Sequence, residues 1–175
     1  MQTKKGFRVK KTTLLIYSAI FTALIFLCTA YILHIPIGMS GGYVHMGDAL
    51  LYLAACVLPT PYAMLACAVG AGLADFASGF PMWIPFTMVI KPCMVLFFTG
   101  KQNAILSKTR NRIAPFFAGL FCVAAYGAAT WLLYGTSKAA LADIPAGLIK
   151  CAANMAVFYP LAAFLDKTNL FRRHL

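Results

Sequence analysis

The sequence predicts an all-α integral membrane protein, a monomeric bundle of six transmembrane helices with both termini in the cytoplasm. Hydrophobic residues make up 62% of the 175-residue chain and charged residues only 11%, whereas a soluble domain carries about 25% charged residues. The apolar residues also fall into six runs, and the longer ones reach the roughly 20 residues that a helix needs to cross the hydrocarbon core.

We expect these six runs to form a single membrane domain over residues 1–175. The second and third runs are short and follow a Gly- and Pro-rich segment, residues 35–44. Irregular backbone at membrane depth persists only where protein or a water-filled cavity covers it, so this region predicts non-ideal helices around a cavity. Residues 135–143 are expected to form a loop. After a basic cytoplasmic N-terminus at residues 1–11, the predicted transmembrane helices cover residues 12–34, 45–58, 62–78, 83–100, 113–134 and 144–165.

The basic residues predict the orientation. The chain has fifteen Lys and Arg against four Asp. Twelve of the fifteen lie in three clusters beside apolar runs, and six spans place these clusters on one side of the membrane. The positive-inside rule makes that side the cytoplasm, with Lys138 outside and Lys91 and Lys150 in the bilayer. Clusters placed in this way suit lipid headgroups and argue against nucleic-acid binding.

Other motifs exclude several chemistries. The six cysteines lie in apolar runs and form no CxxC pair, which is typical of small buried side chains and not of a metal site or a disulfide framework. The chain also lacks the Gly-x-x-x-x-Gly-Lys-Ser/Thr phosphate loop. We therefore expect no metal, no cofactor and no catalytic residue, and any ATP hydrolysis would belong to a partner.

Four charged residues interrupt the apolar runs: Asp48, Asp75, Lys91 and Lys150. A charge at bilayer depth costs roughly 2.5–3.5 kcal/mol on insertion scales, so each needs a reason. One reading is structural ion pairs, such as Asp75 with Lys91. The other reading is a polar substrate site, and it is favoured because the predicted orientation puts all four in the outer half of the membrane.

Further polar and aromatic residues fall at the same depth. His45 lies three residues before Asp48, and Lys150 lies four residues before Asn154, so each pair shares a helical face. Polar groups fix the orientation of a ligand while aromatic faces take a flat ring, which suits a small, polar, ring-bearing solute. Asp48 and Asp75 are expected to support the site. The expected substrate-binding residues are Tyr43, His45, Trp83, Lys91, Trp131, Lys150 and Asn154.

Some of these residues have simpler readings. Trp83 and Trp131 could belong only to an interfacial aromatic belt, and His45 could only cap a helix. The first run carries a separate signal, because Ala19 and Ala23 form a small-xxx-small pair that lets another helix approach closely. That helix could belong to a partner or to the bundle itself.

Two stretches give the chain a family resemblance. The run Gly42-Tyr-Val-His-Met-Gly-Asp-Ala-Leu50 and the run Ala71-Gly-Leu-Ala-Asp-Phe-Ala-Ser-Gly79, with residues 83–91 after it, resemble substrate-binding S components of energy-coupling factor (ECF) transporters. The riboflavin/hydroxymethylpyrimidine-type branch is the most similar. Chain length, six spans, the basic N-terminus and the alanine pair also fit.

The resemblance implies a vitamin-binding subunit of a prokaryotic plasma membrane. Such a subunit docks through the alanine motif of its first helix, here Ala19 and Ala23, onto a transmembrane coupling subunit that carries two cytoplasmic ATPases. It is expected to topple and so carry an outer-half pocket inward. The substrate stays open between the hydroxymethylpyrimidine moiety of thiamin, pyridoxine, riboflavin and another small heterocycle.

Two other classes of function compete with this one. The first is a self-sufficient secondary transporter or channel, which six spans without an evident repeat disfavour. The second is an intramembrane enzyme. Asp48 and Asp75 could form an aspartyl pair, but two aspartates beside lysines would both be ionised and would not share the proton that such a pair needs.

Overall fold

The computed structural model describes residues 11–32, 35–36, 43–100 and 104–168, and within them six α-helices make up nearly all of the structure. A two-residue antiparallel pairing joins β1 (Ile35–Pro36) to β2 (Tyr43–Val44). Two single-turn 3-10 helices, η1 (Pro81–Trp83) and η2 (Ile105–Ser107), link longer elements. The α-helices are α1 (Lys11–Ala30), α2 (Gly47–Val57), α3 (Thr60–Ala77), α4 (Ile84–Val95), α5 (Thr109–Tyr134) and α6 (Ser137–Thr168).

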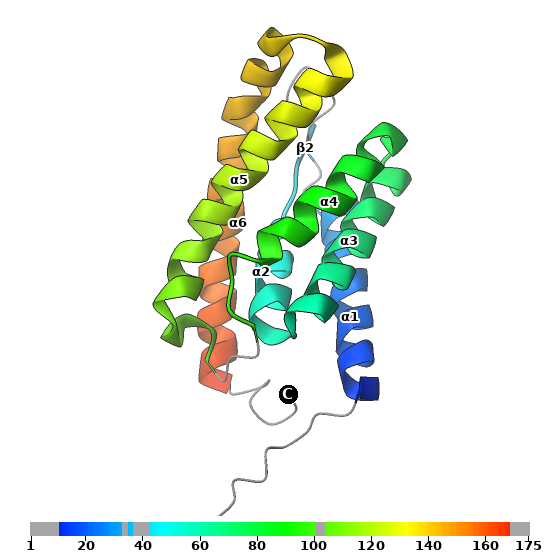
Figure 1. Ribbon diagram of the computed structural model, residues 1–175. Helices are drawn as coiled ribbons and strands as arrows, with labels where there is room; N and C mark the ends of the chain where they lie inside the picture. The colour runs from blue at the N-terminus through cyan, green and yellow to red at the C-terminus, as the bar shows by residue number, and fades with distance from the viewer. Residues whose placement is uncertain (1–10, 33–34, 37–42, 101–103, 169–175) are drawn as a thin grey trace, which may run out of the picture.

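The helices form two groups around a short central helix. α5 packs on α6 along one side, and α3 packs on both α1 and α4 along the other (Figure 1). α2 lies between the groups and contacts α1, α3, α4 and α6. Its side chains are almost wholly buried, with Leu51, Ala54 and Cys56 at 0% exposure. The centre of the molecule is therefore built around a helix of only 11 residues.

Glycine and proline set the ends of several helices. Pro59 and Pro61 begin α3, where a missing N–H is tolerated. Gly79 follows α3 with φ 81°, and Gly135 ends α5 with φ 68°. Both are in the left-handed region, which glycine adopts at little cost. The Gly135 N–H donates to the Trp131 carbonyl, as in a left-handed helix cap.

Close helix approach in one group also requires a glycine. A Cβ at Gly70 of α3 would lie 2.8 Å from the Thr22 carbonyl oxygen of α1. The absence of that atom lets the two backbones approach, as in many membrane helix pairs.

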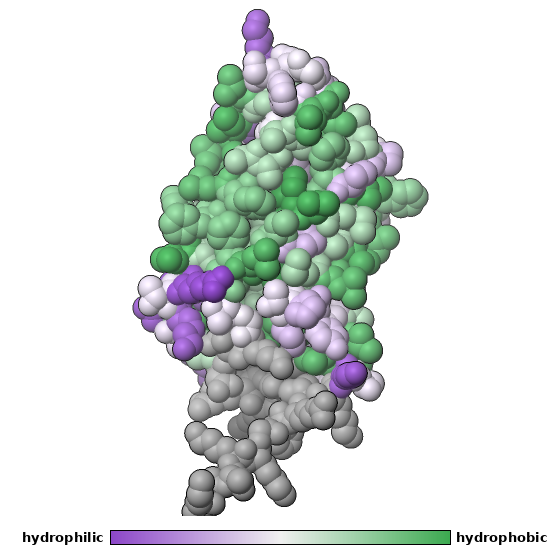
Figure 2. All heavy atoms as spheres, in the orientation of Figure 1, coloured by the Kyte–Doolittle hydropathy of each residue, from purple (hydrophilic) through white to green (hydrophobic). Residues whose placement is uncertain are grey.

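The outer surface has the character expected in a bilayer. Four helices, α1, α3, α5 and α6, are long and apolar enough to cross a membrane. α2 and the η1–α4 stretch, Pro81–Val95, are shorter apolar helices. Apolar side chains cover the middle of the visible face, and hydrophilic ones gather toward its ends (Figure 2). That all six helices span the bilayer, with both termini in the cytoplasm, remains a prediction.

Helix boundaries differ from expectation mainly in α4 and α6. α4 ends at Val95 instead of residue 100, and turns follow. The expected loop over residues 135–143 is wrong, because α6 begins at Ser137. Polar residues there interrupt the apolar run, but the intervening Ala and Leu are strong helix formers. The Gly- and Pro-rich segment, residues 35–44, lies outside the described residues except at its two ends, which pair as β1 and β2.

Candidate functional site

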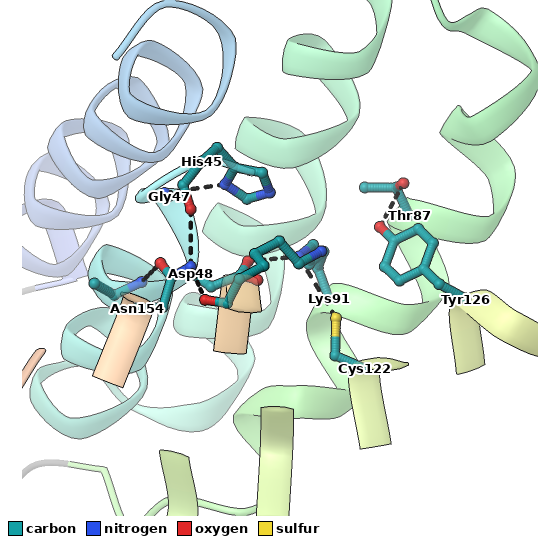
Figure 3. A network of polar contacts seen from close by, with 10 residues as sticks. His45, Gly47, Asp48, Thr87, Lys91, Cys122, Tyr126 and Asn154 are labelled. Atoms are coloured by element: carbon teal, nitrogen blue, oxygen red, sulfur yellow. Dashed lines mark hydrogen bonds and ion pairs between the residues drawn. The ribbon is translucent and has the colours of Figure 1, made fainter. Parts of the chain in front are cut away.

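A buried ion pair joins α4 to the central helix α2. The Lys91 ammonium of α4 lies 2.5 Å from a carboxylate oxygen of Asp48 in the first turn of α2 (Figure 3). The two side chains are only 3% and 5% exposed. Lys91 thus pairs with Asp48, and the alternative reading that paired Lys91 with Asp75 is wrong. Asp75 is itself buried on α3.

A glycine places Asp48 at this point. A Cβ at Gly47 would lie only 1.8 Å from the Thr29 hydroxyl oxygen of α1. Glycine therefore allows the start of α2 to lie directly against α1. His45 lies just before it, is 4% exposed, and accepts a hydrogen bond from the Gly47 N–H at its Nδ1, at 3.1 Å.

Asn154 of α6 fastens the start of α2 from the other side. Its carboxamide oxygen accepts from the Ala49 N–H at 2.8 Å, and its nitrogen donates to the His45 carbonyl at 2.8 Å. The same nitrogen donates to the Lys150 carbonyl at 2.9 Å. Asn154 is 0% exposed, so its amide is engaged with the protein. Its direct role in this conformation is to position the strand-to-helix turn that carries His45 and Asp48.

Tyr126 of α5 lies between two lysines. Its ring centroid is 5.5 Å from the Lys91 ammonium and 5.1 Å from the Lys150 ammonium. Such distances allow attraction between a cation and a ring face. The Tyr126 hydroxyl is 2.8 Å from the Thr87 hydroxyl, and Trp83 packs with a ring centroid 5.9 Å away. The site therefore continues from the ion pair to an aromatic face.

Most of the residues expected from the sequence come together. The residues that belong to this network or lie against the Tyr126 ring are His45, Asp48, Trp83, Lys91, Lys150 and Asn154. Trp131 does not: it is 54% exposed and lies five residues after Tyr126, about 140° around the helix. The backbone of Tyr43 forms β2, which contacts α6, but its side chain lies outside the described part of the structure.

Tyr126, Thr87 and Cys122 belong to the site but were not predicted from the sequence. The Lys91 ammonium also lies 3.9 Å from the Cys122 sulfur. A spacing signal was available, because Thr87 lies four residues before Lys91 and Cys122 lies four residues before Tyr126, so each pair shares a helix face. These two pairs mark the face of α4 and the face of α5 that meet at the site.

A surface groove between α4 and α5 has different chemistry. Its volume is about 360 Å³, and it is lined by apolar side chains, among them Phe86, Val89, Ala125 and Leu132. A groove without polar groups offers nothing to orient a polar solute. The network around Tyr126 is therefore the better candidate site.

Comparison with known proteins identifies the family. The family model described as "ECF-type riboflavin transporter, S component" matches residues 9–167. The chain belongs to this family. A Pyrococcus woesei protein described as an uncharacterized protein in the gap 3′ region is 27% identical over 139 residues, which cover 79% of this chain and 93% of the relative.

Membership of the S-component family gives the cluster its context. S components are the substrate-binding subunits of membrane transporters for vitamin uptake, not enzymes, and they associate with a module of membrane and ATPase subunits. The chain is accordingly a membrane transport component.

The alanine pair of this S component faces outward. Ala19 and Ala23 both lie on the exposed side of α1, whereas Ser18, Phe21 and Ile25 face the bundle. The reading in which the alanines pack inside the bundle is therefore wrong. Their exposed side chains leave this side of α1 open to lipid or to another helix.

Proposed function

We propose that this S component binds a small heterocyclic vitamin or vitamin precursor in the outer half of the membrane and delivers it inward by toppling against an ATPase-driven coupling subunit. The observation that carries the proposal is the cluster of Asp48, Lys91, Tyr126 and Lys150. Side chains from four helices bring charges and an aromatic ring together at the core of a protein from a vitamin-uptake family.

The substrate site is proposed to lie along the aromatic face of the cluster. Tyr126 and Trp83 would take the flat ring of the ligand, and Lys91 and Lys150 would bind its polar atoms. These roles follow from chemistry, since aromatic faces stack on rings while ammonium groups donate to ring oxygens and nitrogens. We add Tyr126 to the residues expected from the sequence and leave Trp131 out. Tyr43 stays in the proposal as part of the segment that would close the site.

His45, Asp48, Asp75 and Asn154 are proposed to support the site. Asp48 holds the Lys91 ammonium at 2.5 Å, and the amide of Asn154 holds the backbone of His45 at 2.8 Å. Preorganised side chains lower the entropy that binding has to overcome. Hydroxymethylpyrimidine, pyridoxine and riboflavin each have the flat ring with polar atoms that this arrangement would take.

Delivery is proposed to depend on the exposed side of α1. Ala19 and Ala23 would meet the coupling subunit, because small side chains let helices pack closely where lipid provides no hydrophobic driving force. The site and the docking patch lie on different helices, so ligand binding and energy coupling can be separated by mutation.

The proposal is tested with the full chain and a coupling module of one transmembrane subunit and two ATPases. We expect the tagged chain to co-purify with the module and to support ATP-dependent uptake of one small heterocyclic vitamin or precursor into proteoliposomes, with riboflavin, pyridoxine and hydroxymethylpyrimidine among the compounds tested. An ATPase variant without its catalytic carboxylate is the control and should abolish uptake. Uptake by the chain alone, driven by an ion gradient, would instead make it a self-sufficient transporter.

Tyr126 allows a sharper test of the site itself. Tyr126→Phe keeps the ring and loses only the contact with the Thr87 hydroxyl, whereas Tyr126→Leu removes the ring face. Base–aromatic stacking is worth about 1–3 kcal/mol, so we expect Tyr126→Leu to weaken binding roughly 5- to 150-fold, far more than Tyr126→Phe. Equal affinity of both variants with wild type would remove Tyr126 from the site.

A further inference from the structure

The cluster around Tyr126 holds two ammonium groups and one carboxylate. Asp48 forms an ion pair with Lys91 at 2.5 Å. Lys150 forms no ion pair with any carboxylate of the residues that the structure describes. Its ammonium instead lies 5.1 Å from the centroid of the Tyr126 ring, which attracts a cation but carries no net charge.

No other aspartate compensates Lys150. All four aspartates of the chain are among the described residues. Asp75 lies on α3, and no salt bridge between described residues joins it to Lys150. Asp143 accepts from the Thr130 hydroxyl at 3.2 Å and lies two helical turns, about 10 Å, from Lys150. Asp166 accepts from backbone N–H groups of η2, near the opposite end of α6.

The positive charge of Lys150, which no carboxylate balances among the described residues, lies at an unusual depth for a charge. It lies near the middle of α6, a helix of 32 residues that is long and apolar enough to cross a membrane. Its depth therefore does not depend on which end of α6 faces the cytoplasm. Charges within membrane spans pair with an opposite charge or mark the path of a substrate. Lys150 has no ion pair with a carboxylate among the described residues, so the second explanation, a substrate path, is left for it.

We infer that the compound bound by this S component carries one negative charge, which pairs with the Lys150 ammonium beside the Tyr126 ring. A carboxylate attached to a flat ring, or to its side chain, has the required charge and shape. A lysine is a compact point charge, and one unpaired lysine balances one negative charge. A phosphate ester carries a charge of about −1.5 to −2 at pH 7 and would leave a net negative site.

This inference rests on the proposed function, and it narrows the substrate class. The test begins with the full chain purified in detergent without added ligand. Compounds released by denaturation are identified by mass spectrometry in positive and negative ion modes. The variants are Lys150→Gln and Lys150→Arg, and the control is Lys138→Gln, an exposed lysine on the same helix. Thermal unfolding of each variant checks that it is folded.

We expect an acid with a single ionised group at pH 7, retained by wild type, by Lys138→Gln and, at a reduced level, by Lys150→Arg. Lys150→Gln should retain it at least tenfold less. A neutral compound or a cation retained in proportion to protein by wild type would overturn the inference. If that neutral compound is also taken up with the coupling module, the proposed function stands and only the charge assignment fails.

A second measurement covers the case in which no compound is recovered. Thermal unfolding of the wild-type protein is followed with nicotinate against nicotinamide and with 4-pyridoxate against pyridoxine, which differ in the acidic group. We expect at least one acid to raise the unfolding temperature more than its neutral partner, and we expect Lys150→Gln to lose that difference. Equal or greater stabilisation by the neutral partners would overturn the inference, as would the failure of every acid.

Discussion

The Lys91 ammonium and the Asp48 carboxylate are 2.5 Å apart at the centre of the bundle, and this pair ties α4 to the first turn of α2. Both side chains are almost completely buried. Removing one partner of a buried ion pair leaves an uncompensated charge, whereas removing both does not. If the pair is structural, single and double substitutions should therefore differ in their effect on the free energy of unfolding.

Neutralising one member of the pair should destabilise the protein. We expect Asp48→Asn and Lys91→Met each to lower the free energy of unfolding by about 3–5 kcal/mol, because each leaves the other charge buried. The double variant should lose clearly less than the sum of the two. Thermal unfolding in detergent measures all three, and strictly additive losses would show that the two side chains do not interact.

Asn154 should matter for stability through α2. Asn154→Ala leaves the Ala49 N–H and the His45 carbonyl without their present partner, and each unsatisfied buried group costs about 1–3 kcal/mol. We expect a loss of about 2–5 kcal/mol by thermal unfolding, together with weaker ligand binding. Ala152→Ser, an exposed position on the same helix, is the control and should change little. A wild-type unfolding temperature for Asn154→Ala would contradict the positioning role.

Two glycines of α5 should respond in opposite ways. A Cβ at Gly119 would lie 2.0 Å from the Cys151 sulfur of α6, whereas a Cβ at Gly127 meets nothing within 4 Å. We expect Gly119→Ala to destabilise the α5–α6 pair and Gly127→Ala to be neutral or stabilising by up to about 1 kcal/mol, from helix propensity. Adding Cys151→Gly to Gly119→Ala should restore part of the stability. Equal unfolding temperatures for both single variants would contradict the close packing.

The predicted orientation can be tested by cysteine labelling in cells. In a background without the native cysteines, Lys138→Cys should react with a membrane-impermeant maleimide from outside. Lys108→Cys should react only after the membrane is made permeable, because it lies in a basic cluster predicted to be cytoplasmic. The reverse pattern would contradict the predicted orientation.

Composition and hydropathy predicted the helices well because their signals are local. A run of about 20 apolar residues needs no partner to be recognised, and the breaks at Pro59, Gly79 and Gly135 follow from the backbone preferences of those residues. The beginning of α6 at Ser137 was missed because polar residues interrupted the hydropathy signal while the hydrogen bonds of the helix continued.

The pairing of residues between helices was harder to predict because it depends on helix rotation. The sequence offered two aspartates for Lys91, and only the packing of α2 between the helix groups selects Asp48. Tyr126 was missed because a tyrosine in an apolar run is unremarkable until a lysine from each neighbouring helix lies over its ring. Trp131 was expected from its depth, but depth says nothing about the face on which a residue lies.

The most direct test of the central claim compares ligand binding with uptake in α1 variants. Ala19→Leu and Ala23→Leu add bulk to an exposed patch of α1 that lies on a different helix from Lys91, Tyr126 and Lys150. The control is Ala124→Leu, an exposed alanine on α5. Ligand affinity of each isolated variant is measured beside ATP-dependent uptake with the coupling module.

If the chain delivers its ligand by docking α1 on a coupling subunit, Ala19→Leu and Ala23→Leu should bind ligand like wild type but lose co-purification and uptake. Ala124→Leu should keep all three. Full uptake with both α1 variants would contradict the account.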